Sequence, residues 1–266
     1  MNSWFDTHIH LFAPEWQQSP QRLYADARTA GIGGMLMPGV RVADWPRLLE
    51  LARELPGVYL APGLHPIYAD QWSSSTAEQL KVLTAEAKVV AIGEIGLDNV
   101  AGPDRAVQET VFREQLSIAL NAGLPVLLHS RKTTGRVIDI LRELDIGQKV
   151  GGVWHGFSGS VQIARELAGL GFKIGVGPIL LRESARKLPQ AVLELPGEAL
   201  VLETDAPDMI SGPLGLLQVA EKLAGLKGWS LEETARITAE NVGQLFARVT
   251  ETAQPCGSAI PITRDA

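Results

Sequence analysis

The chain has 266 residues, of which 45% are hydrophobic, and this is enough for one large apolar core. Its formal net charge of −6 excludes a protein that coats nucleic acid through bulk positive charge, but leaves room for a local cationic groove. The single cysteine, Cys256, excludes an intrachain disulfide and is compatible with a reducing compartment.

The sequence shows no pattern that predicts secretion or membrane insertion. The first residues lack the cationic start and the apolar run of a secretion signal. No stretch reaches the ~20 apolar residues that a membrane-spanning helix requires. We therefore predict a soluble, cytoplasmic protein with no membrane association.

Short apolar runs alternate along the chain with amphipathic stretches. The predicted strands are 4–10, 33–40, 58–65, 89–96, 125–130, 150–157, 173–178 and 199–206. Helical spacing of apolar residues marks the segments between them, such as 105–122 and 161–170. Several of these segments end in glycine, which tolerates the left-handed conformation that closes a helix.

Eight strands alternating with helices predict an α/β fold, specifically a (β/α)8 TIM barrel. An open doubly wound sheet is the alternative, but it usually carries a Gly-rich loop after its first strand. We expect 214–224 to be the eighth helix and 230–249 an appended C-terminal helix. The sequence thus predicts a single domain over 1–250 and a peripheral tail over 251–266.

All five histidines lie at or near the carboxyl end of a predicted strand. They are His8, His10, His65, His129 and His155. Histidines used for packing would also be scattered over helices and loops. Because the carboxyl ends of the strands carry the active site of a TIM barrel, this bias predicts a site there.

His8 and His10 are two residues apart on one predicted strand, so both side chains face the same side. They are therefore able to share one metal ion. Asp6 has the same parity and is expected below them, where a carboxylate orients a ligand histidine. The alternative is a solvated His-Ile-His turn without a ligand.

Glu94 stands in an apolar, Gly-flanked strand, where a carboxylate is costly to bury unless it is paired or binds a cation. Its two oxygens are able to bridge two metal ions. The alternative is a salt bridge to a barrel arginine, for which the nearby predicted strand ends offer Arg131.

His129 and His155 end adjacent predicted strands, which lie about 4.8 Å apart, so their side chains are able to converge on one ion. Each alone would more often be a core residue. Asp205 ends the eighth strand beside the first, as a third ligand, a general base, or both. Glu203 shares its parity and is the alternative inward acid, but Asp205 lies nearer the strand end.

Together these motifs resemble the TatD family of metal-dependent deoxyribonucleases, within the amidohydrolase-like barrels. The similar segments run from residue 6 to 246, and their order and spacing are highly specific as a set. They are Asp6-Thr7-His8-Ile9-His10, Gly63-Leu64-His65-Pro66, Gly93-Glu94-Ile95-Gly96-Leu97-Asp98, Leu128-His129-Ser130-Arg131, His155-Gly156-Phe157-Ser158-Gly159-Ser160, Leu202-Glu203-Thr204-Asp205-Ala206-Pro207, and Asn241 with Leu245-Phe246.

The resemblance implies two divalent metal ions in a DNA exonuclease. One ion is expected on His8, His10 and Asp205 and the other on His129 and His155, with Glu94 bridging them. Imidazole ligands favour zinc on chemical grounds, whereas nucleases often use magnesium or manganese.

The chain departs from the family pattern in loops that border the substrate. A short loop with Ser211-Gly212-Pro213 replaces an Asn-x-Pro element after the eighth strand. Asn99-Val100 stands where an aromatic residue is common, and Gly156 stands where a cysteine is frequent. All six presumed ligands are present, so these changes bear on the substrate and not on metal binding.

The expected mechanism is attack on phosphorus by a hydroxide held between the two ions, with Asp205 as proton acceptor and Glu94 as bridge. The substrate is expected to be DNA, in single-stranded form. Its phosphates are expected to be bound by Arg131, Lys132 and Arg182, and His65 either hydrogen-bonds a phosphate or braces the wall.

Two other functions are compatible with the same residues. One is a metal-dependent hydrolase of carboxylic esters or amides, of the aminoacyl or lactone type. The other is a non-catalytic barrel that binds nucleic acid, which would be expected to have lost some of the ligands.

Overall fold

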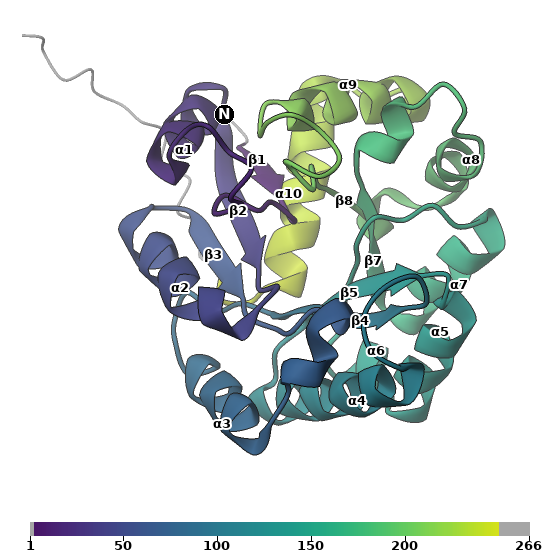
Figure 1. Cartoon of the computed structure of the whole chain (residues 1–266). Coiled ribbons are helices and arrows are strands. Elements are labelled where there is room, and N and C mark those ends of the chain that lie inside the picture. The colour runs from purple at the N-terminus through teal and green to yellow at the C-terminus, as the bar shows by residue number, and fades with distance from the viewer. Residues whose placement is uncertain (1–2, 250–266) are drawn as a thin grey trace, which may run out of the picture.

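The chain forms a ring of parallel strands surrounded by helices in a computed structural model, which describes residues 3–249 (Figure 1). The strands are β1 Trp4–Asp6, β2 Ile32–Pro38, β3 Val58–Ala61, β4 Ile92–Asp98, β5 Val126–Arg131, β6 Gly152–Trp154, β7 Phe172–Val176 and β8 Leu200–Leu202. The predicted tail over 251–266 lies outside the described residues, so the predicted boundary at residue 250 stays a prediction.

Helices and short 3-10 turns connect the strands. The α-helices are α1 Pro20–Thr29, α2 Trp45–Glu54, α3 Ser74–Leu83, α4 Arg105–Ala122, α5 Thr134–Glu143, α6 Ile146–Lys149, α7 Val161–Leu170, α8 Lys187–Glu194, α9 Gly215–Lys227 and α10 Leu231–Leu245. The 3-10 turns are η1 Val42–Asp44, η2 Pro66–Gln71, η3 Pro178–Leu181 and η4 Gly197–Ala199.

The strands pair in two parallel groups, β1-β2-β3 and β4 to β8 in order, and both gaps between the groups are closed. Backbone hydrogen bonds from Thr7 to Leu202 (2.9 Å) and from Asp205 to His8 (2.8 Å) join the β8 side to the β1 side. On the other side Val90 donates to the carbonyl of Leu60 (3.1 Å). The ring is therefore a closed barrel, as the alternation of strands and helices predicts.

Several strands are shorter than the predicted ranges. β1 ends at Asp6, β3 at Ala61 and β8 at Leu202, so the predicted extensions to 10, 65 and 206 are wrong. The chain leaves regular pairing there because side chains take over backbone partners. The carboxylate of Asp6, for example, accepts from the backbone N–H groups of His8 and Thr204.

Two of the outer helices begin and end where the local sequence predicts. α4 and α7 coincide with 105–122 and 161–170, and Gly123 and Gly171 close them with φ of 63° and 101°. The Ser230 hydroxyl accepts from the N–H of Glu233 and caps α10. α10 ends at Leu245, earlier than the predicted 249.

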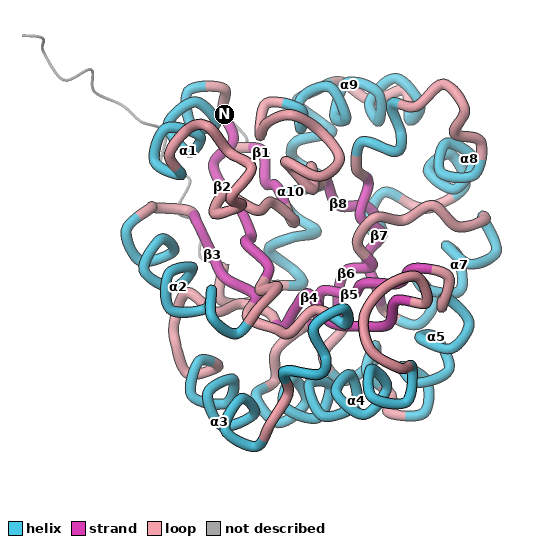
Figure 2. The backbone as a smooth tube through the Cα atoms, viewed as in Figure 1, coloured by secondary structure: helices cyan, strands magenta, loops and turns pink. Residues whose placement is uncertain are grey.

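The end of the barrel at the amino termini of the strands is filled by apolar side chains, here called the apolar plug. The plug contains Phe5, Leu36, Tyr59, Ala61, Val90, Ala91, Leu127, Val153, Val201, Val242 and Phe246. Val242 lies on α10 and Phe246 directly follows it; α10 lies behind the ring of strands in Figure 2 and contacts β1 and β8. The barrel is thus closed at this end. Polar side chains gather at the opposite end, at the carboxyl ends of the strands, here called the mouth.

None of the helices within residues 3–249 combines the length and the apolar composition needed to cross a bilayer. The cytoplasmic location expected from the sequence stays a prediction.

Candidate metal centre

The polar cluster lies directly above the apolar plug on the same strands. Side chains alternate along a strand, so a residue two positions after a plug residue faces the interior as well. His129 follows Leu127 in this way, and His155 follows Val153. Glu203 follows Val201, and Asp205 comes two residues later. The cluster at the mouth is therefore built by the periodicity that builds the plug.

The first group of potential ligands comes from the loops after β1 and β8. His8 Nε2 lies 3.2 Å from His10 Nε2 and 3.3 Å from Glu94 Oε2. Asp205 Oδ1 lies 3.6 Å from His8 Nε2 and 3.3 Å from His10 Nε2. Two ligands of a tetrahedral zinc ion with bonds of ~2.0–2.1 Å lie ~3.4 Å apart, so the spacing of this group fits one such ion.

A second group surrounds the other oxygen of Glu94. Glu94 Oε1 lies 2.7 Å from His129 Nδ1 and 3.7 Å from His65 Nε2. The two histidine nitrogens are 3.2 Å apart, and the three atoms are close enough to hold a cation. The two oxygens of one carboxylate thus face two different sets of histidines.

His155 lies between the two groups. Its Nε2 is 3.4 Å from Asp205 Oδ2 and 4.0 Å from Glu94 Oε1, and its ring stacks on that of His8 at a centroid distance of 3.6 Å. The pairing of Leu128 with Trp154 places His129 and His155 at the same height, as the sequence predicts. The sequence did not predict that His65 joins His129; His65 directly precedes η2, and its side chain accepts from the N–H of Ile67.

A further carboxylate, that of Asp98, contacts His129 through the ring nitrogen that does not face Glu94. His129 Nε2 lies 3.2 Å from Asp98 Oδ2, and the other oxygen of Asp98 accepts from the N–H groups of Val100 and Ala101. Such a contact fixes which ring nitrogen faces a metal. Sequence reasoning missed Asp98, although its place four residues after Glu94 on the same strand puts both on one face.

Glu203 and Asp205 contact the histidines from different sides. Glu203 Oε2 lies 3.1 Å behind His155 Nδ1, and Oε1 accepts from the N–H of Gly156 at 2.7 Å. Asp205 faces the histidines from the mouth, on a backbone with φ of 50° in the left-handed region. The preference for Asp205 as the inward acid agrees with this arrangement.

Asp6 orients the site through the backbone. Its carboxylate binds the N–H groups of His8 and Thr204 and the Thr204 hydroxyl, at 2.6 to 3.1 Å. Burial raises the pKa of Asp6 to about 7, although these hydrogen bonds act in the opposite direction. Within residues 3–249, His8 Nδ1 has no hydrogen-bond partner, so the expected contact of Asp6 with the imidazole is absent.

The electrostatics of the cluster reflect burial and mutual attraction. Burial by itself would raise the pKa of Glu94, but His8 and His155 hold it well below its usual range. Burial lowers the pKa of His65 to about 4, so this ring is neutral near pH 7. The contacts with Asp98 and Glu94 outweigh burial at His129 and raise its pKa to about 9. Charged oxygens and imidazoles therefore converge where water is scarce, which is the chemistry of a cation site.

The three cations expected to bind phosphate are exposed on loops that follow the strands. Arg131 ends β5, Lys132 follows it with φ of 58°, and Arg182 follows η3 after β7. Within residues 3–249 none of the three forms a salt bridge, although many other arginines do. Their charges thus remain available to a ligand.

The chain is similar to known proteins over most of its length. Residues 5–247 match the family described as TatD related DNase. YabD of Bacillus subtilis, named as an uncharacterized metal-dependent hydrolase, is 34% identical over 251 residues, which cover 91% of this chain and 98% of that protein.

A second relative and a solved structure cover a similar length. The 3'-5' ssDNA/RNA exonuclease TatD of Klebsiella pneumoniae is 31% identical over 258 residues, or 91% of this chain and 97% of that protein. The crystal structure of YjjV, a TatD homolog from Escherichia coli, superposes with a TM-score of 0.85 at 36% identity, over 92% of this chain and 98% of that one.

Proposed function

The chain belongs to the TatD family of metal-dependent hydrolases, and from this premise we propose that it is a two-metal exonuclease that cleaves phosphodiester bonds of single-stranded DNA. The observation that carries the proposal is Glu94, whose two oxygens lie against His8 on one side and His129 on the other. The name of the Klebsiella pneumoniae relative supports the substrate class.

Two groups of side chains would hold the ions. His8, His10, Asp205 and Glu94 Oε2 form one group, with spacings that fit a single ion. Glu94 Oε1 and His129 begin the other, which His155 would complete. When bound, divalent ions lower the pKa of water from 15.7 to roughly 7 and neutralise charge on phosphoryl oxygens.

Each residue of the mouth then has a defined task. Asp205 is ionised, because His155 and His10 hold its pKa well below its usual range despite burial, which acts in the opposite direction. Its carboxylate accepts the proton of the attacking water, whereas His155 Nε2, which lies 3.4 Å away, is reserved for the second ion. Arg131, Lys132 and Arg182 hold the phosphates on either side of the reacting one.

Metal identity follows from the same ligands and from the task. Imidazole-rich groups bind zinc well, whereas phosphodiester cleavage commonly uses magnesium or manganese, which prefer oxygen ligands. We propose magnesium or manganese as the working ions, with zinc able to occupy the His8 and His10 group.

The test is hydrolysis of single-stranded DNA by metal-stripped protein that is refilled with magnesium, manganese or zinc. Loss of terminal nucleotides is expected to depend on the ion and to fall by about 10³-fold in Asp205→Asn. Asp139→Asn, an exposed carboxylate on α5, is the matched control and is expected to keep full activity.

Absence of cleavage with every ion, in protein that carries metal, would contradict the nuclease. A panel of carboxylic esters, lactones and amides then identifies the alternative hydrolase. The non-catalytic barrel considered from the sequence does not agree with membership of a family of hydrolases.

A further inference from the structure

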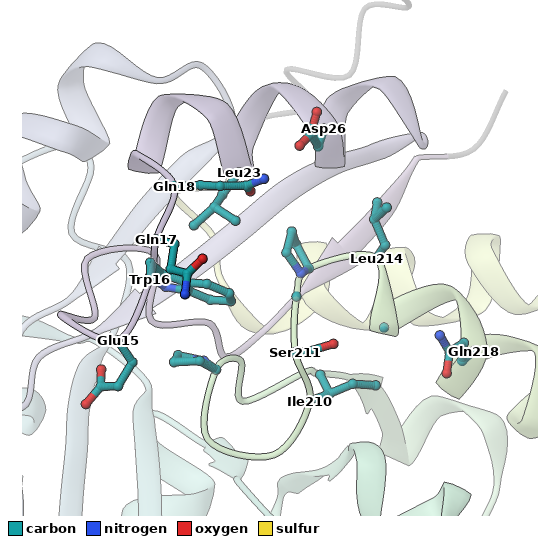
Figure 3. A pocket seen from close by; sticks show the side chains of 14 residues that line it. Glu15, Trp16, Gln17, Gln18, Leu23, Asp26, Ile210, Ser211, Leu214 and Gln218 are labelled. Atoms are coloured by element: carbon teal, nitrogen blue, oxygen red, sulfur yellow. The ribbon is translucent and has the colours of Figure 1, made fainter.

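A cavity of about 640 Å³ opens between the segments that precede α1 and α9 (Figure 3). It lies between the loop after β1 with the start of α1 and the loop after β8 with the start of α9. Its lining includes Trp16, Gln17, Gln18, Ile210, Gly212 and Gln218. A cavity of this size is within the range of small-molecule sites, ~300–1,000 Å³.

The cavity is built by the same two loops that carry the first group of potential ligands. The indole N–H of Trp16, on the cavity wall, donates to the carbonyl of His10 at 2.7 Å. On the other side, Pro207 lines the cavity two residues after Asp205, and the N–H of Met209 donates to the carbonyl of Asp205 at 2.9 Å. The walls of this cavity are therefore continuous with the segments that carry His10 and Asp205.

The lining suits an uncharged, partly polar ring. Leu23, Ile210 and Leu214 supply apolar surface, and Trp16 supplies an aromatic side chain. The residues around the cavity include the carboxylates of Glu15 and Asp26 and no lysine or arginine, so it is unsuited to phosphate.

Three amide side chains in the lining are free to bind a ligand. Gln17, Gln18 and Gln218 are exposed, and within residues 3–249 none of their side chains forms a hydrogen bond. An amide both donates and accepts, which matches the mixed edge of a nucleobase.

We propose that this cavity binds the nucleobase of the nucleotide whose phosphate lies at the metal centre. The inference rests on the proposed nuclease function and divides the substrate in two. Phosphates lie toward the metal centre and the exposed cations after β5 and β7, and the base lies between the loops after β1 and β8. The loop with Ser211-Gly212-Pro213, which departs from the family pattern, then forms part of the base site.

The chain offers a position from which to fill the cavity without disturbing the fold. A Cβ atom at Gly212 would meet no atom within 4 Å, and Gly212 has no left-handed backbone that a side chain would strain. Gly212→Trp is therefore expected to project into the cavity. Gly225→Trp, at an equally open position on α9 outside the cavity lining, is the matched control.

Two chromogenic phosphodiesters separate the base from the reacting group. They are the p-nitrophenyl ester of thymidine 5′-phosphate and methyl p-nitrophenyl phosphate, in which a methyl group replaces the nucleoside. We expect Gly212→Trp to raise KM for the thymidine ester about tenfold at similar kcat, which is the range of base stacking. Hydrolysis of the methyl ester is expected to stay within about twofold, and Gly225→Trp to change neither.

A binding measurement provides a readout without turnover. Calorimetric titration of the metal-loaded protein with thymidine 5′-phosphate is compared with titration by deoxyribose 5-phosphate, which lacks the base. The wild type is expected to bind the thymidine compound about tenfold more tightly, and Gly212→Trp to bind both equally.

Equal affinity of the wild type for the two phosphates, or a Gly212→Trp protein that retains the preference for thymidine, would overturn the base site. If Gly212→Trp is inactive on both esters, the double variant Gln18→Ala, Gln218→Ala provides the test. An unchanged KM of this variant for the thymidine ester would contradict the inference. A wild type that hydrolyses neither phosphodiester contradicts the proposed function, and the binding comparison still decides the cavity.

Discussion

The two ends of this barrel are made from the same strands and have opposite character. At the amino ends, the apolar plug fills the interior, and Val242 of α10 and Phe246, which follows α10, seal it. Two residues further along the same faces, the side chains are His129, His155 and Glu203.

The difference shows how one fold separates stability from chemistry. Burying apolar area is favourable at about 25 cal/mol per Å², whereas burying charge is costly unless it is paired. The mouth concentrates buried carboxylates and imidazoles that stabilise one another only in part, as the unpartnered His8 Nδ1 within residues 3–249 indicates. The plug is therefore expected to stabilise the fold, and the mouth to carry the reaction.

The largest expected effect is on catalysis, from Glu94→Gln. Removing the carboxylate that faces both groups is expected to lower kcat/KM for single-stranded DNA by about 10³-fold and to reduce bound metal. The midpoint of thermal unfolding, measured in chelator, is expected to fall as well, because His8 and His155 lose the buried charge that Glu94 supplies. Normal kcat/KM together with normal metal content would contradict the assignment of the reaction to the mouth.

The reverse experiment is Phe246→Ala in the plug. This change leaves a cavity under the barrel and is expected to reduce the free energy of unfolding by about 3–5 kcal/mol in a denaturant titration. The kcat of the folded protein is expected to be unchanged. Leu231→Ala, an exposed position at the start of α10, is the control and is expected to cost little.

A smaller effect is expected from Asp98→Asn, which acts on the mouth through His129. The neutral side chain no longer fixes the ring, and we expect metal affinity at the second group to fall by about tenfold. Titration with manganese, followed calorimetrically, measures the change. Asp104→Asn, an exposed carboxylate before α4 whose side chain forms no capping hydrogen bond, is expected to leave affinity as it is.

The smallest effect concerns Glu109, which lies on α4 outside the ring of strands. Hydrogen bonding to Arg136 and Arg105 keeps the pKa of Glu109 below its usual range, so the pair stabilises the fold above about pH 4.5. This contribution is lost as the pH falls through the lowered pKa. Glu109→Gln is thus expected to lower the unfolding midpoint by about 2 °C at pH 7 and by less at pH 3. An equal decrease at both pH values would contradict the assignment to charge.

The sequence by itself determined the barrel and the residues that meet at its mouth. Alternation of apolar runs with amphipathic helices indicates parallel strands, and the carboxyl ends of parallel strands point the same way. Strand-end residues as distant as His8 and Asp205 therefore come together without knowledge of any contact. Such predictions depend only on local periodicity.

The tertiary structure decided which side chains contact one another. His65 lies against His129, Asp98 stands behind His129, and Asp6 binds backbone in place of an imidazole. Each of these contacts depends on how a loop leaves its strand, and several strands end earlier than their apolar pattern predicts. Side-chain hydrogen bonds between segments far apart in the chain determine those loops, and no local pattern in the sequence encodes them.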